Sequence, residues 1–370
     1  MNFGFTEEQE LLRQEVRKFL DAHAPLEQVR KLMETPDGFS RDHWKQIGEL
    51  GWLGLTLPEA HGGAGLGWVD LVVVLEEMGR TLFPSPFLGA TIGATAVREA
   101  GSDAQRSRWL PALADGSAIA SLAWLEPSDR MDAAGVEATA TPSSDGFVLS
   151  GVKEQVLDAH VADRFVVAVR AGGAVRLAVV ERGAAGVTVE PTPSIDQTRR
   201  VGRVRLANVR VAADHVLADP SEATLARVFD LATAAVTAES LGAAEAAIRL
   251  TVRYANERIQ FGSPIGRFQG VKHPLAESFV DVESAKSILY YAAWALDERD
   301  AGASRAVSLA KAYASEAFAR IGIDAVQLHG GVGFTWEYDP HLYLKRSKWA
   351  RPAFGDADWH YDRAIALGEK

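Results

Sequence analysis

The fold is decided by the stretch Arg258-Ile259-Gln260-Phe261-Gly262-Ser263-Pro264-Ile265-Gly266-Arg267-Phe268-Gln269. Apolar and small residues recur at helical spacing before it, from about residue 225 to 254, and again after it, from about 271 to 296. Within the stretch, two glycines and a proline break the helical pattern. We therefore predict two long helices joined by a stiff turn.

The turn carries side chains that suit a flat, phosphorylated ligand. The guanidinium of Arg258 can donate paired hydrogen bonds to a diphosphate. The rings of Phe261 and Phe268 offer faces on which a flat ring can stack. The alternative is an ordinary helix hairpin with a solvated arginine and core phenylalanines, which composition alone favours.

The order of the residues shifts this balance. The pattern Arg-x-Gln-Phe-Gly-x-Pro-Ile-x-x-Phe-Gln resembles the turn of the acyl-CoA dehydrogenase family. A second stretch, Gln327-Leu328-His329-Gly330-Gly331-Val332-Gly333-Phe334, is similar to that family's Gln-x-x-Gly-Gly-x-Gly-Phe segment. The resemblance implies an α+β fold, the acyl-CoA dehydrogenase fold, with an N-terminal helical domain, a middle β-sandwich or barrel and a C-terminal four-helix bundle.

The periodicity along the chain agrees with this plan. Helical patterns fill residues 1–117, where Thr6 and Gln9 can form a capping box for the first helix. Short valine-rich runs in residues 118–218 predict antiparallel strands of a sandwich or barrel. Helical patterns return in residues 219–370, with long segments at 222–257, 268–298 and 304–329. A glycine-rich loop at residues 58–67 lacks the context of a phosphate loop, so we assign it a structural role.

Composition excludes several classes of function. The chain has 370 residues, a formal net charge of -10 and no cysteines. The acidic charge argues against nucleic-acid binding, and the lack of thiols excludes disulfides and cysteine-ligated metals. His341 and His360 have no acidic partner at metal-ligand spacing, so we expect no metal site.

Two further absences concern location. No apolar run reaches the roughly 18 residues of a membrane span. The acidic N-terminus lacks the pattern of a signal peptide. We expect no membrane contact and a cytoplasmic location.

The resemblance also implies a reaction and a cofactor. Members of the family oxidise an acyl-CoA thioester to its 2,3-enoyl form: a carboxylate base removes a proton, a hydride passes to FAD, and electrons leave to an electron-transfer flavoprotein. By resemblance, Arg258, Phe261 and Gln269 hold the FAD diphosphate and adenosine of a neighbouring subunit. Gln327, Gly330 and Gly331 approach the same cofactor from the other side, and the glycines permit close backbone approach. An isolated monomer should therefore bind FAD poorly.

The segments expected at the flavin ring match the family less well. They read Ala123-Trp124-Leu125-Glu126-Pro127-Ser128-Asp129 and Lys153-Glu154-Gln155-Val156-Leu157-Asp158-Ala159-His160. The family's usual Trp and hydroxyl contacts are missing. Backbone contacts from Leu125 and Val156 to the flavin are still expected, and Trp124 is either a replacement or a core residue.

The catalytic base is where the resemblance fails. The two positions at which family members carry the glutamate are Gly355 and Ala232 in this chain. Three interpretations remain open: Asp356 takes over, Glu239 takes over although an ion pair suits it better, or a related chain supplies the base. In support of the third interpretation, the chain resembles subunits of bacterial α2β2 acyl-CoA dehydrogenases that shorten steroid side chains.

Other functions also stay open. The chain could be a homo-oligomeric enzyme, a flavoprotein of the same fold that oxidises a substrate other than a CoA thioester, or a non-catalytic partner subunit. The sequence does not define the acyl chain.

Overall fold

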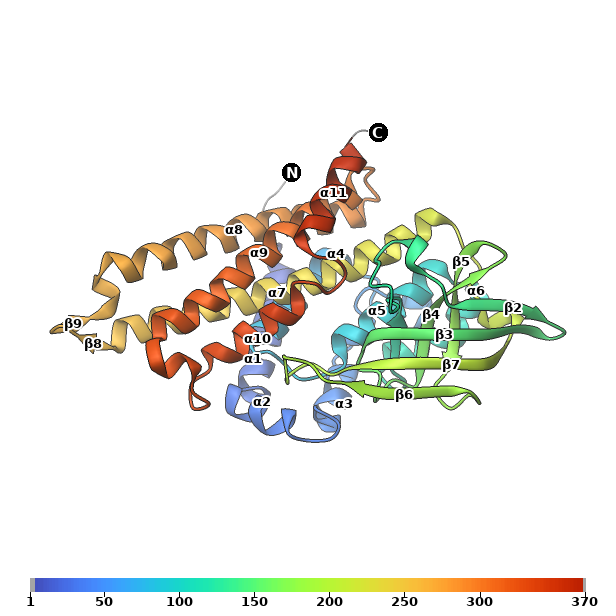
Figure 1. The fold of residues 1–370 in the computed structure, drawn as a ribbon, viewed down its shortest axis with the longest axis horizontal. Coiled ribbons are helices and arrows are strands. Elements are labelled where there is room, and N and C mark those ends of the chain that lie inside the picture. Colours follow the sequence, from blue (N-terminus) through green and yellow to red (C-terminus); the bar gives the residue numbers. More distant parts are fainter. Residues whose placement is uncertain (1–3, 369–370) are drawn as a thin grey trace.

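The computed structural model describes residues 4–368 and divides the chain into helical, β and helical regions in that order (Figure 1). The predicted capping box at the start of the first helix is confirmed: the Thr6 side chain accepts from the Gln9 amide, and the Gln9 side chain accepts from the Thr6 amide. The helices of the first region are α1 (Glu7–His23), α2 (Leu26–Met33), α3 (Arg41–Glu49), α4 (Trp68–Arg80), α5 (Phe87–Ala100) and α6 (Asp103–Ala114).

The middle region is one curled sheet of seven strands in the order β1-β4-β2-β3-β7-β6, with β5 paired to β4. The expectation of antiparallel strands throughout was wrong in two places, because β1 and β2 both run parallel to β4. The β2–β3 hairpin lies between β1 and β4 in the sequence, so the chain returns in the same direction. The strands are β1 (Ala120–Ala123), β2 (Thr139–Ser143), β3 (Gly146–Leu157), β4 (Arg164–Ala171), β5 (Ala174–Glu181), β6 (Val187–Thr192) and β7 (Val201–Ala212).

Three long helices dominate the last region: α7 (Glu222–Glu257), α8 (Gln269–Asp297) and α9 (Ala303–His329). Their bounds agree with the periodicity to within about a residue. The remaining side of the bundle is filled by α10 (Pro340–Ala350) and α11 (Ala357–Gly368), which both pack against α9. In the turn between α7 and α8, β8 (Ile259–Gln260) and β9 (Ser263–Pro264) form a small ribbon.

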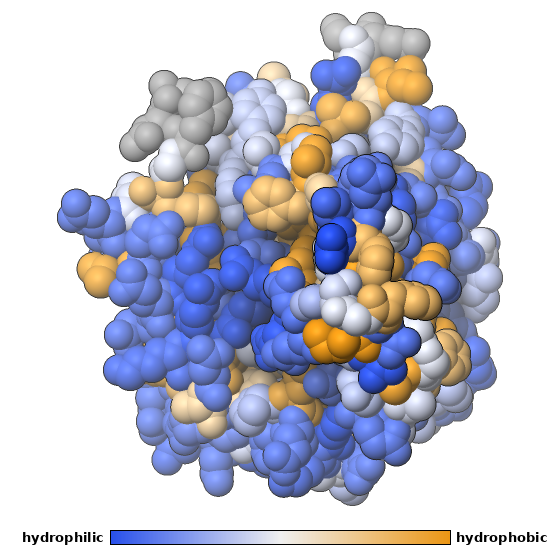
Figure 2. Space-filling model, turned by 90° about the vertical axis from the view of Figure 1, so that its left-hand side faces the viewer, coloured by the Kyte–Doolittle hydropathy of each residue, from blue (hydrophilic) through white to orange (hydrophobic). Residues whose placement is uncertain are grey.

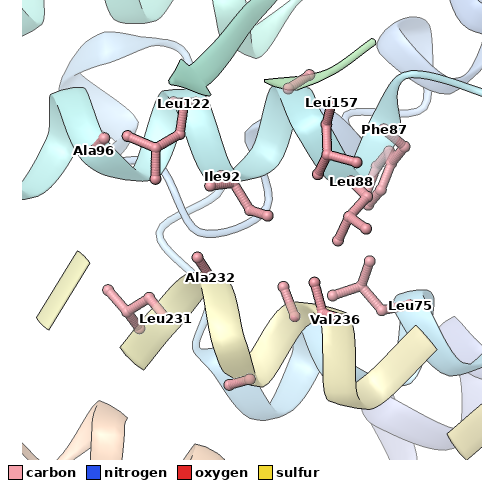
Figure 3. Close-up of a cluster of buried hydrophobic side chains, with 14 of the residues drawn as sticks. Leu75, Phe87, Leu88, Ile92, Ala96, Leu122, Leu157, Leu231, Ala232 and Val236 are labelled. Carbon is pink, nitrogen blue, oxygen red and sulfur yellow. The ribbon is translucent and has the colours of Figure 1, made fainter. Parts of the chain in front are cut away.

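Helix α7 is the centre of the molecule, and α4 crosses it at unusually close range. A Cβ added to Gly242 would lie 1.8 Å from the Glu76 carbonyl oxygen, and one added to Gly79 would lie 1.9 Å from the Glu239 carbonyl oxygen. Only glycine permits this contact. On another side of α7, apolar side chains of α5, β1 and β3 pack against Leu231, Ala232 and Val236 (Figure 3).

The glycine-rich loop before α4 packs on its own backbone. A Cβ on Gly63 would lie 2.0 Å from the Leu57 carbonyl oxygen, and the Asp297 carboxylate of α8 accepts from the amides of Trp68 and Val69 at the start of α4. These contacts support the structural role expected for the loop. Among residues 4–368, no helix has the length and apolar character to cross a membrane, and no cluster of three acidic or histidine side chains could hold a metal ion.

Candidate active site

The turn between α7 and α8 presents its predicted site residues to the outside. Arg258, Phe261 and Gln269 are all exposed, and Phe261 exposes 92% of its surface. The Arg258 carbonyl accepts from the Ile265 amide at 2.9 Å, which closes the turn. Phe261 has a left-handed backbone with φ of 52° and contacts Phe268 edge to face at 5.9 Å. The alternative of a core phenylalanine is therefore wrong for Phe261.

The end of α9 lies beside the same turn. Tyr254 of α7 stacks on His329 with ring centroids 4.2 Å apart, and its hydroxyl donates to the His329 carbonyl at 3.2 Å. Gln327, Gly330 and Gly331 are exposed at this end, and Figure 2 views the molecule from here, with apolar and polar side chains side by side. Burial lowers the pKa of His329, whose ring packs against Tyr254.

The glycine pair at the end of α9 is open to the outside. Gly330 has φ of 65° and ψ of -147°, a conformation that disfavours any side chain. A Cβ on Gly331 would meet nothing within 4 Å in this chain. Nothing in this chain therefore requires a glycine at position 331. If a glycine is needed there, the group that approaches it lies outside the chain, as expected for a cofactor shared with a neighbour.

A cavity of about 360 Å³ lies between the sheet and the segment that joins α10 to α11. Its walls come from β1 and the loop after it, the end of β3, the loop between β6 and β7, and the segment from α10 to α11. The lining residues are Leu122, Trp124, Leu125, Asp129, Met131, Glu154, Gln155, Leu157, Pro193, Ser194, Ile195, Trp349, Pro352, Ala353 and Phe354.

The two residues predicted at the flavin ring occupy different positions relative to this cavity. Leu125 lines it, and its carbonyl accepts from the Glu154 amide at 2.8 Å. Val156 is buried, while its neighbours Gln155 and Leu157 form the wall. An irregularity in the pairing of β3 with β7 between Lys153 and Val156 turns Gln155 toward the cavity, with φ of 52°. A backbone contact from Val156 to a flavin stays a prediction.

A buried ion pair fixes the loop that follows β1. Lys153 Nζ donates to Glu126 Oε1 at 2.5 Å and to the Trp124 carbonyl at 3.2 Å. Glu126 also accepts from the amides of Glu137 and Ala138, so both ends of the loop are held together. Burial lowers the pKa of Lys153 to about 8, against the opposing effect of Glu126. Trp124 is both a wall of the cavity and a packed residue, because its indole N–H donates to the Met131 carbonyl at 3.0 Å.

Glu239 lies in a second buried network. Its carboxylate accepts from Arg199, and the Arg346 guanidinium lies 3.4 Å away. Arg346 also donates to Asp196, and Arg199 lies over the Trp349 ring at 5.0 Å. Glu239 is 4% exposed and is not part of the cavity wall. The structure thus places it in the ion pair that its sequence context favoured over a catalytic role.

Asp356 has a different task in this structure. It is exposed and its Oδ1 accepts from the Trp359 amide at 2.9 Å, which caps α11. It lines a neighbouring cavity of about 380 Å³ together with Gly355, Trp359 and the 129–132 loop. Its geometry is that of a helix cap.

Neither of the two positions that the family resemblance gives for the glutamate has surroundings that favour a carboxylate. Gly355 has φ of 99°, and an added Cβ would lie 2.8 Å from Trp359 Cε3 and 3.0 Å from His360 Nε2. Ala232 is 1% exposed and lies within the apolar cluster of Figure 3. A charged side chain there would lose its hydration without a partner.

The predicted cofactor residues form two groups. The turn and the end of α9 lie at one end of the long helices, and the sheet lies toward the other (Figure 1). Each group suits part of an FAD molecule: an exposed guanidinium, an exposed ring and open glycines at the turn, and an aromatic-lined cavity beside the sheet. The residues would fit this cofactor, and their roles toward it stay predictions.

Comparison with known proteins agrees with these features. A family model described as the N-terminal domain of acyl-CoA dehydrogenase matches residues 6–117, and one described as the C-terminal domain matches residues 223–365. Acyl-CoA dehydrogenase IpdE2 of Mycolicibacterium smegmatis is 34% identical over 343 residues, which cover 92% of this chain and 93% of that protein.

Two solved structures show the same fold over nearly the whole chain. A chain of the ChsE4-ChsE5 complex from Mycobacterium tuberculosis matches with a TM-score of 0.93 and 29% identity over 100% of both chains. A chain of a variant Tcur3481-Tcur3483 steroid ACAD matches with a TM-score of 0.89 and 31% identity over 98% of this chain and 97% of that chain. The chain described here therefore belongs to the acyl-CoA dehydrogenase family of FAD-dependent oxidoreductases.

Proposed function

We propose that this chain is one subunit of a heteromeric acyl-CoA dehydrogenase and that a related chain carries the catalytic base. The observation that carries this proposal is the lack of a carboxylate at both base positions. Gly355 has a left-handed backbone that disfavours a side chain, and Ala232 lies in the core. The two carboxylates considered as replacements, Asp356 and Glu239, are committed to a helix cap and to a buried ion pair.

The positions of the two groups of cofactor residues suggest what this subunit contributes to the complex. The turn at Arg258 is exposed at the end of the long helices that lies away from the sheet, so we infer that it reaches the FAD of a neighbouring chain (Figure 1). The base positions, in contrast, belong to the cavity end. We infer that the reaction takes place in the cavity of the base-carrying partner, while this chain completes that partner's FAD site.

The chemistry follows from the family's reaction. The partner's carboxylate takes the proton from the carbon next to the thioester carbonyl, and a hydride leaves the following carbon. Bound FAD accepts this hydride. In this chain, Arg258 supplies positive charge and paired donors for the diphosphate, and Phe261 supplies a ring face. Gln269 and Gln327 supply amides, and the open backbone at Gly330 and Gly331 admits the cofactor.

The comparisons support the heteromer and suggest its substrate. The ChsE4-ChsE5 match is a complex of two chains, and the Tcur3481-Tcur3483 match is described as a steroid ACAD. We propose an acyl-CoA with a bulky, steroid-derived acyl group as the substrate class. An electron-transfer flavoprotein as electron acceptor and a cytoplasmic location are part of the proposal and rest on the family resemblance alone.

The first experiment compares this chain expressed alone with the same chain co-expressed with a base-carrying relative from its own organism. Alone, it should purify with little flavin and show no bleaching of flavin absorbance by acyl-CoA. Together, the pair should purify with stoichiometric FAD that acyl-CoA reduces. About one FAD per chain in a homo-oligomer that acyl-CoA bleaches would contradict the proposal, and would send the search for a base back to Asp356 and Glu239.

A further control separates a silent subunit from a self-sufficient flavoprotein. Bound flavin in the chain alone that stays oxidised with acyl-CoA, but is reduced by another substrate such as a nitroalkane, would favour a different reaction on the same fold. Replacement of the partner's base by glutamine should abolish reduction in the complex without loss of FAD. Reduction that survives this replacement would show that the base lies elsewhere.

A further inference from the structure

The backbone around the exposed glycine pair has few constraints of its own. His329 is the last residue of α9, so its carbonyl oxygen is one of the four at a helix end that have no partner within the helix. Gly330 and Gly331 follow at once, and glycine restricts the backbone less than any other residue. Contacts from outside α9 must therefore fix the position of the pair.

Tyr254 of α7 supplies such contacts before the pair. Its hydroxyl donates to the His329 carbonyl at 3.2 Å, which gives this carbonyl the partner that the helix lacks. Its ring lies on the His329 ring, with centroids 4.2 Å apart and planes at 24°. The His329 ring is itself held, because its Nδ1 donates to the Ala325 carbonyl at 2.6 Å. A hydrogen bond and a ring stack thus hold the end of α9 against α7.

The backbone beyond the pair is held as well. Arg30 of α2 donates to the Tyr338 carbonyl and to Asp339 Oδ1, both at 2.8 Å. The Tyr338 ring meets the Tyr254 ring edge to face, with centroids 6.3 Å apart. Tyr254 therefore contacts the chain on both sides of the glycines, at residues 329 and 338.

Tyr254 also stands one helical turn before Arg258. The Arg258 amide donates to the Tyr254 carbonyl at 2.8 Å, which closes the last turn of α7. The turn between α7 and α8 then folds back on this end of the helix, since a Cβ on Gly266 would lie 3.2 Å from the Ala255 carbonyl oxygen. The two segments expected to bind the cofactor are thus both attached to α7 at Tyr254.

The geometry points to Tyr254 as a positioning residue, which fixes the turn at Arg258 and the glycine pair at the spacing that one FAD molecule needs. Tyr254 acts through the backbone of Arg258 and His329 and does not itself contact the cofactor. Two segments whose spacing is set beforehand bind a shared ligand more tightly than segments that must first be ordered. The inference rests on the proposed function, because the cofactor concerned is the FAD of the neighbouring chain.

The first test measures FAD affinity in the complex of this chain with its base-carrying relative. Fluorescence titration of the flavin-free complex should show that Tyr254→Phe weakens FAD binding about 3- to 10-fold, as expected for loss of one hydrogen bond. Tyr254→Leu, which also loses the ring stack, should weaken it about 10- to 100-fold. An affinity equal to that of wild type in either variant would overturn the inference.

A tyrosine elsewhere on the bundle provides the matched control. Tyr291 of α8 is 45% exposed and stacks on Trp294, and among residues 4–368 its hydroxyl has no hydrogen-bond partner. Tyr291→Phe should therefore leave FAD affinity unchanged. A loss equal to that of Tyr254→Phe would show that the position of the hydroxyl does not matter, and would overturn the inference.

Hydrogen exchange separates positioning from direct contact with FAD. In the full chain without FAD, the amides of residues 329–335 should exchange about threefold faster or more in Tyr254→Phe, while exchange in the sheet should not change. Unchanged exchange in this segment would overturn the inference even if FAD affinity fell, because the hydroxyl would then act on the cofactor itself.

Kinetics separate this role from a part in the reaction. With FAD in excess, Tyr254→Phe should recover the kcat of wild type and its KM for acyl-CoA, because a positioning role is complete once FAD is bound. A kcat that stays low at saturating FAD would overturn the inference.

Failure of this inference can be told from failure of the proposed function. A pair of unlike chains that holds no FAD would contradict the proposed function and this inference with it. A pair that holds FAD and reduces it with acyl-CoA, but binds FAD equally well with and without the Tyr254 hydroxyl, would contradict this inference alone.

Discussion

Asp158 shows how strongly one residue's environment can change its chemistry. It follows β3, is 5% exposed, and has one carboxyl oxygen without a hydrogen-bond partner in the described structure. Burial raises its pKa to about 7; Arg199 and Arg346 oppose the shift, and Glu239 adds to it. The native chain therefore keeps a proton on Asp158 at mildly acidic pH, where the unfolded chain has lost it.

The sign of the resulting pH effect follows from linkage. Between about pH 4 and pH 7 the native state binds more protons at Asp158 than the unfolded state, so this residue makes the free energy of unfolding fall as pH rises. We expect Asp158→Asn to remove this fall, and the difference between variant and wild type to grow by up to about 1.4 kcal/mol per pH unit. Urea unfolding at several pH values across this range measures it. Parallel curves for the two proteins would contradict the prediction.

At this scale the sequence motifs gave candidates for the cofactor site, but not the partners of single charges. The motifs pointed to Arg258, Gly330 and Gly331, whose roles toward FAD stay predictions. The task of Glu239 depends on Arg199 and Arg346, which are distant in the sequence and meet it only in the folded chain. The lining residues Gln155 and Met131 were missed because no local pattern marks a bulge or a loop tip as the wall of a cavity.

At the scale of elements, the crossing of α4 and α7 depends on two glycines. Gly242→Ala should lower the free energy of unfolding by about 2–3 kcal/mol or more, since its Cβ would overlap the Glu76 carbonyl and push the helices apart. Gly270→Ala in α8 is the matched control, because its Cβ meets nothing within 4 Å. It should be neutral or stabilise the chain by up to about 1 kcal/mol. Chemical denaturation of both variants measures their free energies of unfolding. Equal changes would show that α4 and α7 can shift to accommodate the added methyl group.

The sequence predicted the helices better than the sheet for a physical reason. The periods of α7, α8 and α9 are repeated over many turns, so their bounds were placed to within about a residue. The parallel pairing of β1 with β4 joins segments separated by a hairpin, and alternation of side chains does not encode which strands become neighbours. The small ribbon of β8 and β9 was predicted only as a stiff turn.

At the scale of the whole molecule, Arg258 should contribute to FAD binding by a neighbouring chain and not to the stability of its own chain. In the complex, Arg258→Ala should weaken FAD binding by about 10- to 100-fold, as expected for loss of hydrogen bonds to a charged group. The thermal stability of the chain alone should not change, because the side chain is exposed. Arg258→Lys, which keeps the charge but not the paired donors, should fall between the two.

A control on the same helix makes this test specific. Arg249→Ala removes an exposed arginine of α7 that pairs with Glu245 within its own helix. It should leave FAD binding unchanged. Fluorescence titration of the flavin-free complex measures all three variants. Equal losses for Arg249→Ala and Arg258→Ala would mean that general charge, and not contact with the diphosphate, explains the effect.

The placement of the two groups of cofactor residues at opposite ends of the helices also bears on how such a chain can arise (Figure 1). After a gene duplication, two sister chains that pair with each other have two cofactor sites between them. A mutation that removes the catalytic base from one of the two chains inactivates one site and leaves the other active. The turn between α7 and α8, which serves the active site, lies far from the mutated position. Selection then acts separately on this turn, which the intact site still needs, and on the silenced site, which no longer reacts.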